Sequence, residues 1–259
     1  MVIKKSYSLF NRMSLGWSLV KSSGYINYQV PSIVSQNLQV YLLPSSYSGS
    51  GSSWDNVQNG TDATMFNSPS FTSGLGFTFN GTTQYGTLPS VSSITDYTSS
   101  ENYTIEVWCY ISSVQNDTAA PDNCIFEKWN TTNQASYPYV CRYVRSGSTV
   151  RFAAYNGSSN PGVTVAVGTD VWVQLVGVFD HTNDLLSMYV NGSFGASAAM
   201  VITSINNNST VNIARRGNTV GGGTNYFTGK IGVIRIYNTA LSDSQVAQNF
   251  QATRKSYGI

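Results

Sequence analysis

The chain has 259 residues and a formal net charge of +2, and only 10% of its residues are charged. A chain of this length buries a proper core, and its charged fraction is well below the usual value of about 25%. Nucleic-acid binding is not expected, because the densest basic pairs, Arg215–Arg216 and Arg254–Lys255, form no basic patch and are interpreted as solvated strand or helix ends. No run reaches the roughly 18 apolar residues of a membrane helix, so no membrane contact is expected either.

Residues 1–36 are predicted to form an N-terminal arm. Two lysines precede a partly apolar stretch, as in a signal peptide, but Arg12 interrupts that stretch and no small-residue cleavage site follows. We therefore expect the arm to be retained. Its apolar side chains, among them Phe10 and Trp17, make it too apolar for a free tail. The arm is expected to dock on its own domain or on an adjacent subunit, as a tether.

Residues 37–259 are predicted to form one domain built from many short strands. Runs of β-branched and aromatic residues alternate with clusters of Gly, Asn, Asp and Ser, a spacing typical of a sandwich or jelly roll. In YTIEVWCYI (103–111), one face of the strand should carry Glu106 and Trp108, and the other should carry Ile105, Val107, Cys109 and Ile111. The predicted fold class is all-β, an antiparallel jelly-roll β-sandwich with a short C-terminal helical segment.

Two hairpins are expected in the middle of the domain. VWVQLVGVFDHTNDLLSMYVNG should turn at residues 180–184, which places His181, the only histidine, in an exposed turn. NCIFEKW and YPYVCRYV should pair around residues 130–136, and Cys124 and Cys141 then fall opposite each other, within reach of a disulfide. The disulfide is an option, and the favoured interpretation is buried free thiols that act as small hydrophobic side chains. No zinc site is expected, because CxxC spacing is absent.

The segment KIGVIRIY near the C-terminus is predicted to be a strand with two apolar faces. Ile231 and Val233 are expected on one face, and Ile234 and Ile236 on the other. A strand that is apolar on both sides lies inside a stack of layers rather than at the surface. We therefore expect it to be a central strand of the domain.

A short helix is predicted after that strand. Ser242 fits an N-cap, and Gln245, three residues further on, can reach back to it as in a capping box. Val246 and Phe250 then form a short apolar stripe. The helix is expected to lie along the edge of the sandwich.

The C-terminal passage resembles the laminin-G-like, concanavalin-A-like lectin/glucanase superfamily, whose members end in a G-x-I-x-x-V-R-I-Y-N-x-A-L-S pattern and a short helix. Here the pattern runs from Gly229 to Ser242, with Gly232 where members often carry an acidic residue. Three further blocks match in order: FTFNGTTQYGTLP, YTIEVWCYI and VWVQLVGVFDHTNDLLSMYVNG. The resemblance implies the sandwich fold, which hosts lectins, hydrolases, adhesion modules and structural proteins. Within the family, NFQATRKSYGI at the end and PSSYSGSGSSWDNVQNG near the start most resemble the versions found in viral and phage particle proteins.

An enzyme is not expected. Hydrolases of this fold place two or more carboxylates on one strand face, and Glu101, Glu106 and Glu127 do not stand in such a spacing. Glu106 is interpreted as an ordinary strand residue. A triad would have to use His181, which as a turn residue lacks an orienting partner.

Carbohydrate binding is one candidate function. Sugar recognition uses exposed aromatic side chains together with polar groups on loops. The loops 45–56, 154–162 and 216–226 offer Tyr47, Tyr155 and Tyr226 as stacking platforms, and the alternative is that such rings pack under their own loops.

A bound metal or cofactor is not predicted. Asp180 and Asp184 flank one turn and Asp55 and Asp62 another, which leaves calcium as an option without a specific motif. Aspartates that cap their own turns are the alternative interpretation.

A structural role in a virus particle is the other candidate, and the sequence favours it. A nearly uncharged surface suits close packing against neighbours, and the arm suits a tether. The expected protein is a non-catalytic minor capsid, decoration or tail component, located in the virion. Its expected partners are other virion structural proteins, such as the major capsid protein, and glycans are the alternative partners of a displayed adhesin.

Overall fold

A computed structural model of the chain describes residues 19–22, 25–28, 31–58, 60–129, 137–155, 158–201, 209–217 and 225–259. The predicted tether residues, Phe10 and Trp17, lie outside the described residues. Strands β1 (Leu19–Ser22) and β2 (Tyr25–Tyr28) pair with each other in a two-stranded sheet of their own.

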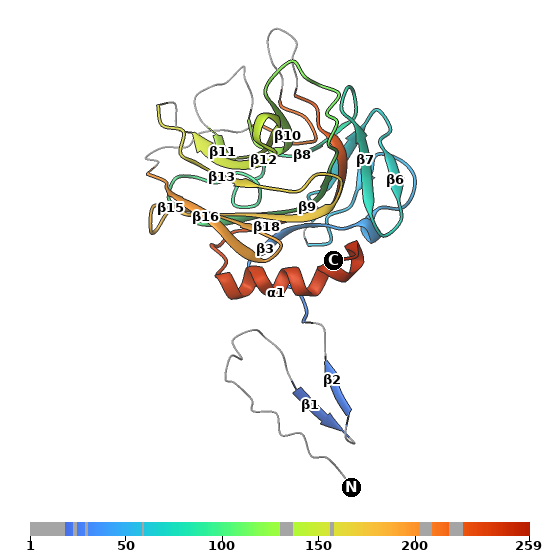
Figure 1. Ribbon diagram of the computed structural model, residues 1–259, viewed down its shortest axis with the longest axis vertical. Helices are drawn as coiled ribbons and strands as arrows, with labels where there is room; N and C mark the ends of the chain where they lie inside the picture. The colour runs from blue at the N-terminus through green and yellow to red at the C-terminus, as the bar shows by residue number, and fades with distance from the viewer. Residues whose placement is uncertain are drawn as a thin grey trace.

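Two antiparallel sheets form the sandwich, as the sequence predicted (Figure 1). The sheet that we call the front sheet has the strand order β13 (Gly162–Ala166), β12 (Thr149–Tyr155), β11 (Tyr137–Val144), β10 (Asp122–Glu127), β17 (Val211–Ile213), β8 (Tyr85–Leu88), β5 (Ala63–Phe66) and β4 (Ser53–Trp54). The back sheet has the order β16 (Ser193–Ala199), β15 (Leu185–Val190), β14 (Trp172–Asp180), β9 (Tyr103–Ile111), β18 (Thr228–Tyr237), β7 (Gly76–Asn80) and β6 (Ser70–Thr72), and β3 (Leu38–Leu42) also pairs with β18.

The core lies between the two sheets and follows the predicted alternation. On β9, Ile105, Val107, Cys109 and Ile111 all belong to the core cluster and are fully buried. Trp108, between them, faces away from the core and stacks on Tyr257 at the C-terminus, with 4.6 Å between ring centroids. Both faces of β9 are therefore covered, as expected for a central strand.

Strand β18 is central, as predicted, but one of its residues faces the other way. Ile231 lies in the core together with Ile234 and Ile236, whereas Val233 lies on the outer face. The pairing of β18 with β9 shifts register between Ile231 and Val233, and this bulge turns Ile231 inward. Gly232 occupies the bulge, where an added Cβ would lie 2.2 Å from the Tyr257 hydroxyl. Any larger side chain would therefore disrupt the packing.

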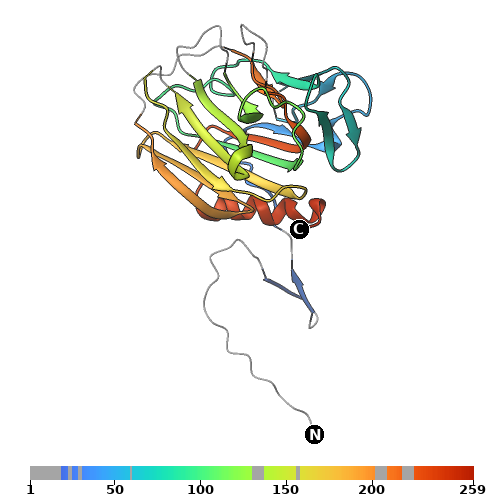
Figure 2. The same cartoon turned by 45° about the horizontal axis from the view of Figure 1, so that its top comes forward.

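Helix α1 (Asp243–Thr253) begins at the predicted capping box: Ser242 Oγ accepts from the backbone of Gln245, whose side chain accepts from the Ser242 N–H at 2.9 Å. The helix crosses the outer face of the back sheet and does not follow an edge. Its Asn249 Nδ2 donates to Glu106 on β9 and to the hydroxyl of Tyr237 on β18, two central strands of that sheet. In both views the helix lies on the side of the back sheet away from the front sheet (Figures 1 and 2). A 3-10 turn, η3 (Arg254–Tyr257), follows it, and η1 (Pro44–Ser46) and η2 (Arg145–Gly147) are further such turns.

The sandwich also holds part of the segment predicted to be the arm. Val34 is buried, its N–H donates to Asn249 Oδ1 at 2.8 Å, and its carbonyl accepts from the Tyr237 hydroxyl. The Ser32 carbonyl accepts from the side chain of Gln248 on the same helix. Contacts with helix α1 thus begin a few residues before the predicted domain start.

The cysteines are free thiols, as the sequence favoured, and the possible disulfide between Cys124 and Cys141 is not formed. β10 and β11 form the expected antiparallel pair, but Cys124 lies opposite Arg142, and Phe126 lies opposite Cys141. A bulge between Cys124 and Phe126 shifts the register, so the two thiols are not cross-strand neighbours. Cys109, Cys124 and Cys141 are all buried free thiols. Burial raises the pKa of each, which makes them unreactive in the folded protein.

Candidate functional site

The outer face of the front sheet carries aromatic and arginine side chains that point away from the core. On β10, Phe126 faces inward into the core, and the next residue, Glu127, therefore faces outward. Its cross-strand partners are Val140 on β11 and Asn212 on β17. Val140 belongs to a separate small cluster with Tyr137 and Ala153, not to the core. No helix of the described chain covers this face, in contrast to the back sheet (Figures 1 and 2).

A pocket of about 380 Å³ lies on this face, and we call it the Trp129 pocket; it is lined by Trp129, Tyr137, Arg142, Tyr155 and Asn160. The ring of Tyr137 is buried, with its centroid 5.9 Å from Trp129 and 5.4 Å from Tyr155. The Tyr137 hydroxyl donates to Asn160 Oδ1 at 3.3 Å. Trp129 and Tyr155 are half-buried, so each presents part of its ring to the pocket. The result is an aromatic wall with a polar rim.

Arg142 supplies the charge of the Trp129 pocket. Its Nε donates to Glu127 Oε2 at 2.7 Å, and its Nη1 lies 3.5 Å from Asp122 Oδ2. Only 9% of the residue is exposed, and its Nη2 has no hydrogen-bond acceptor within the described structure. Burial opposes the charge, but Glu127 and Asp122 more than compensate and raise the pKa of Arg142, so the guanidinium stays protonated. A buried donor left without an acceptor costs about 1–3 kcal/mol.

Arg216 approaches the same pocket from the end of β17. Its Nη2 lies 2.8 Å from Asp122 Oδ1, and its guanidinium carbon is 4.6 Å from the Trp129 ring centroid. The Arg142 guanidinium lies 4.8 Å from the same centroid. The sequence-based interpretation of Arg215–Arg216 as a solvated strand end is wrong for Arg216, which is partly buried by this ion pair and by Trp129.

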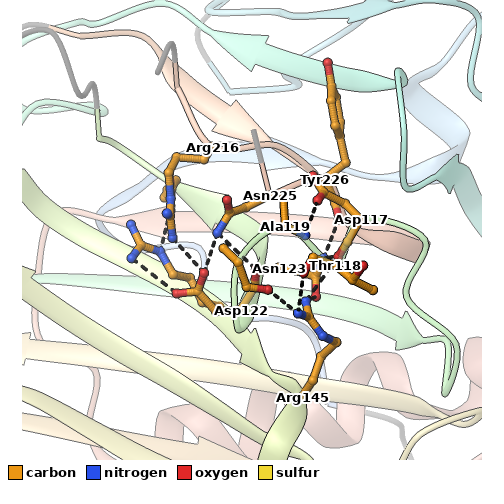
Figure 3. A network of polar contacts seen from close by, with 12 residues as sticks. Asp117, Thr118, Ala119, Asp122, Asn123, Arg145, Arg216, Asn225 and Tyr226 are labelled. Carbon is orange, nitrogen blue, oxygen red and sulfur yellow. Dashed lines mark hydrogen bonds and ion pairs between the residues drawn. The ribbon is translucent and has the colours of Figure 1, made fainter. Parts of the chain in front are cut away.

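A network of polar contacts fixes Asp122 and the loop before β10 (Figure 3). Asn225 donates through Nδ2 to both the carbonyl and the carboxylate of Asp122. Arg145 donates to Asn123 Oδ1 at 2.6 Å and to the carbonyl oxygens of the loop residues 117, 118 and 120. Because Asp122 is held in this way, it can in turn hold the two arginines beside Trp129.

The three predicted tyrosines do not form one site. Tyr155 lines the Trp129 pocket. Tyr226 is positioned by the Figure 3 network, where its N–H donates to Asp117 Oδ2, but its ring points away and lies 6.5 Å from Tyr85. Tyr47 bridges to Trp54 on β4, at the opposite edge of the front sheet from β12.

Tyr47 lines a different pocket of about 500 Å³, together with Met65, Phe77 and the loop around Asn67. Its ring packs on Phe71 and Phe77 with centroids 4.7 and 4.8 Å away, and its hydroxyl donates to the Gly51 carbonyl. The alternative interpretation, an aromatic ring that packs under its own loop, describes this contact set better. This pocket also lacks a charged lining residue.

Sequence reasoning missed Trp129, Tyr137 and Arg142. All three lie in the two segments predicted to form a hairpin, in which only the cysteines were candidate site residues. A signal was present: Arg142 interrupts an otherwise uncharged strand, YPYVCRYV, and a charged residue in such a strand requires a partner.

The glutamates are not arranged as a hydrolytic pair. Glu106 is buried under helix α1 on the back sheet, and Glu127 is buried on the front sheet, so the two lie on opposite outer faces. Glu101 accepts from the Thr98 N–H at 2.8 Å and from the Ser93 hydroxyl, within an exposed turn.

His181 lies in the predicted turn between β14 and β15 but is half-buried, not exposed, because its ring packs 5.6 Å from Tyr103. This burial lowers the pKa of His181. The turn aspartates cap their own backbone: Asp180 accepts from the Asn183 N–H, and Asp62 from the Asn56 N–H. Across the described residues, no three His, Cys, Asp or Glu side chains group as metal ligands. None of the helices in the described part of the chain has the length and apolar character needed to cross a lipid bilayer.

The sandwich of two antiparallel sheets with a helix behind one of them defines a jelly-roll protein of the concanavalin A type. The chain belongs to the concanavalin A-like lectin/glucanases superfamily, whose family model matches residues 80–247. No curated protein sequence matches the chain.

Solved structures with a similar fold include two toxin domains and a sialidase. The binding domain of Paraclostridial Mosquitocidal Protein 1 has a TM-score of 0.66 and 14% identity over 83% of this chain and 52% of that one. The botulinum neurotoxin serotype D/C binding domain has a TM-score of 0.62 and 13% identity, over 84% of this chain and 52% of that one. Trypanosoma rangeli sialidase has a TM-score of 0.65 and 16% identity, over 88% of this chain and 35% of that one. The chain thus spans about half of the toxin domains and a third of the sialidase, and identities this low show the fold alone.

Proposed function

We propose that this protein is a non-catalytic carbohydrate-binding domain whose ligand lies in the Trp129 pocket. The observation that carries the proposal is the combination of an aromatic wall with a buried, charged donor, Arg142 Nη2, that has no acceptor in the described structure. Sugars offer an apolar ring face to aromatic side chains and oxygen acceptors to donors. The pocket volume of about 380 Å³ also falls within the range of about 300–1,000 Å³ typical of small-ligand sites.

The proposal of a non-catalytic role is supported by the placement of the carboxylates. Glycoside hydrolysis needs two carboxyl groups about 5–9.5 Å apart on either side of the bond. The carboxylates beside the Trp129 pocket, Glu127 and Asp122, are engaged with Arg142 and Arg216. A glycan that binds the protein should therefore be recovered intact after prolonged incubation, as checked by chromatography of the sugar.

A glycan array followed by calorimetry tests the binding proposal. Trp129→Ala should weaken binding of the best glycan about tenfold or more, since truncating a central aromatic anchor commonly costs about 2 kcal/mol or more. Phe194→Ala is a matched control, because this aromatic residue is 56% exposed and lies on β16 of the back sheet. The proposal fails if no glycan binds, or if both variants bind as the wild type does.

A location on a virus particle, with residues 1–36 as the tether, is the second proposal. Strands β1 and β2 support it, because among the described residues they pair with each other alone, and an isolated hairpin is marginally stable in water without a surface to pack on. Deleting residues 1–30 keeps Val34 and its contacts with Asn249 and Tyr237. The shortened protein should fold and bind glycans but no longer incorporate into particles. Normal incorporation would contradict the tether.

A further inference from the structure

A second aromatic cluster lies on the same outer face, on the other side of β17. Phe66 on β5 and Tyr85 on β8 are cross-strand partners, and their rings stack with 4.6 Å between centroids. The Arg215 guanidinium lies 3.5 Å from the Tyr85 ring centroid. Phe66 is 36% exposed and Tyr85 is half-buried, so the stacked rings present aromatic surface on this face. We call Phe66, Tyr85 and Arg215 the Phe66 cluster.

The Phe66 cluster and the Trp129 pocket are joined by two consecutive arginines. Arg215 reaches Tyr85 on β8, whereas Arg216 reaches Trp129 beyond β10, and β8 and β10 flank β17 in the sheet. Strands two places apart in a sheet are separated by about 10 Å. A short oligosaccharide spans this distance, and a single sugar does not.

The positive charge on this face exceeds the negative charge. The carboxylates of Asp122 and Glu127 pair with Arg142 and Arg216. Arg215 forms no ion pair with any described residue: its Nη2 reaches only the neutral Asn212 Oδ1, at 3.5 Å, and its Nε has no partner. The face therefore keeps an unneutralised guanidinium beside Phe66.

Arg151 is a second guanidinium without a described carboxylate partner. It lies directly opposite Arg142 across β11 and β12, an unfavourable juxtaposition of like charges. Its Nη2 donates only to the backbone carbonyl and side-chain oxygen of Asn160, at 3.1 and 3.2 Å. Asn160 also lines the Trp129 pocket, so Arg151 stands at its rim.

We propose that the ligand is an acidic oligosaccharide that extends from the Trp129 pocket to the Phe66 cluster, with its carboxylates bound by Arg151 and Arg215. This inference rests on the proposed function. Guanidinium groups match carboxylates in geometry and charge. Arg142 and Arg216 are already paired with Asp122 and Glu127, so this face offers two guanidinium groups, Arg151 and Arg215, to an acidic ligand. Binding of a nucleic-acid strand rests on many phosphate contacts, so a short acidic sugar chain fits this face better.

The experiment compares acidic glycans with their neutral parents. The probes are tetragalacturonate and its methyl ester, sialylated and sulfated lactosamines with unmodified lactosamine, and a ten-residue oligothymidylate. We expect the tightest glycan to carry a carboxylate. Arg151→Gln and Arg215→Gln should each weaken its binding about tenfold, as for loss of a charge-assisted contact, and leave the neutral parent unaffected. Arg254→Gln is the matched control, because Arg254 directly follows helix α1, which packs on the outer face of the back sheet, and this variant should bind as the wild type does.

The outcomes separate this inference from the proposed function. If Trp129→Ala abolishes binding but neither arginine variant changes it, the domain binds glycans and the inference is wrong. Tightest binding of a neutral or sulfated glycan, or of the oligothymidylate, also overturns it. If no probe binds, the proposed function fails and the inference fails with it. Unfolding temperatures of the variants check that each is folded, and Arg215→Lys should recover part of the affinity because it retains the charge.

Discussion

The two outer faces of the sandwich can be compared through the glutamate–arginine pair that each carries. On the back sheet, Glu106 and Arg235 are cross-strand partners joined at 2.5 Å, and neither is exposed. On the front sheet, Glu127 and Arg142 are joined at 2.7 Å. The first pair lies under helix α1, and the second lies on a face that no described helix covers.

The surroundings of the two carboxylates differ accordingly. Both oxygens of Glu106 accept hydrogen bonds, Oε1 from Gln174 and Arg235 and Oε2 from Asn249 on the helix. In the front-sheet pair, Glu127 Oε1 and Arg142 Nη2 have no hydrogen-bond partner in the described structure. Arg235 Nε of the back-sheet pair also lacks an acceptor, but that guanidinium is enclosed by helix α1, where it donates to Thr253. The unsatisfied atoms of the front-sheet pair lie on the face without a described helix, where a ligand or bound water can reach them. We call Glu106–Arg235 the covered pair and Glu127–Arg142 the open pair. We infer that the covered pair anchors the helix and that the open pair serves binding.

The largest effect is expected from breaking the covered pair. Glu106→Ala leaves the Arg235 charge buried without its carboxylate, which should lower the free energy of unfolding by about 3–5 kcal/mol. Urea unfolding followed by tryptophan fluorescence measures it. Phe194→Ala on the same sheet controls for an unspecific loss. A decrease below about 1 kcal/mol would show that helix α1 does not depend on the pair.

Lys128, the residue that directly follows β10, gives a pH-dependent test next to Glu127 but on the inner side of the sheet. Its ammonium donates to Ser90 Oγ and the Ser209 carbonyl, and its nearest charge, Asp96, is 3.8 Å away. Burial lowers the pKa of Lys128 from 10.5 to about 8, against the opposing effect of Asp96. Below pH 8 the folded protein therefore carries a buried, poorly solvated ammonium, which lowers the free energy of unfolding. Between pH 8 and 10.5 the ammonium is deprotonated in the folded protein but not in the unfolded chain, so the free energy of unfolding rises with pH.

The stability of the wild type should consequently rise relative to Lys128→Met by about 1.4 kcal/mol per pH unit in this window. Urea unfolding of both proteins at pH 8, 9 and 10 measures the difference. A constant difference would mean that Lys128 has an ordinary pKa in the folded state.

A smaller effect is expected at the open pair. In Glu127→Ala, Asp122 still lies 3.5 Å from Arg142 Nη1 and 2.8 Å from Arg216 Nη2, and water can reach this face. We expect a loss of about 1–2 kcal/mol in unfolding free energy, together with weaker glycan binding, because Arg142 loses its orientation. The same urea and calorimetry measurements apply. A loss equal to that of Glu106→Ala would remove the distinction between the faces.

The smallest effect is expected at the three cysteines, Cys109 on the back sheet and Cys124 and Cys141 on the front sheet. All three thiols are buried and burial raises the pKa of each, so a thiol-specific reagent at pH 8 should label none in the native protein and three after denaturation. Mass spectrometry without reductant counts the labels. One label in place of three after denaturation would indicate a disulfide and contradict the register of β10 and β11.

The fold could be predicted well from the sequence because its signals are local. The alternation in residues 103–111, the turn at residues 180–184 and the cap at Ser242 each depend on a few neighbouring residues. The candidate site could not be predicted in the same way. Its side chains come from β11, β12 and the ends of β10 and β17, and Tyr155 alone among the lining residues was predicted from the sequence as a stacking platform.

The sequence by itself determined the sandwich and its capped helix, because hydrophobic periodicity and capping act over a few residues. Only the tertiary structure decided which residues meet across strands. The bulges at Gly232 and between Cys124 and Phe126 turn Ile231 inward and separate the cysteines, because a shift of one residue moves a side chain to the other face. The same registers bring Trp129, Tyr137 and Arg142 together on the one outer face that no described helix covers.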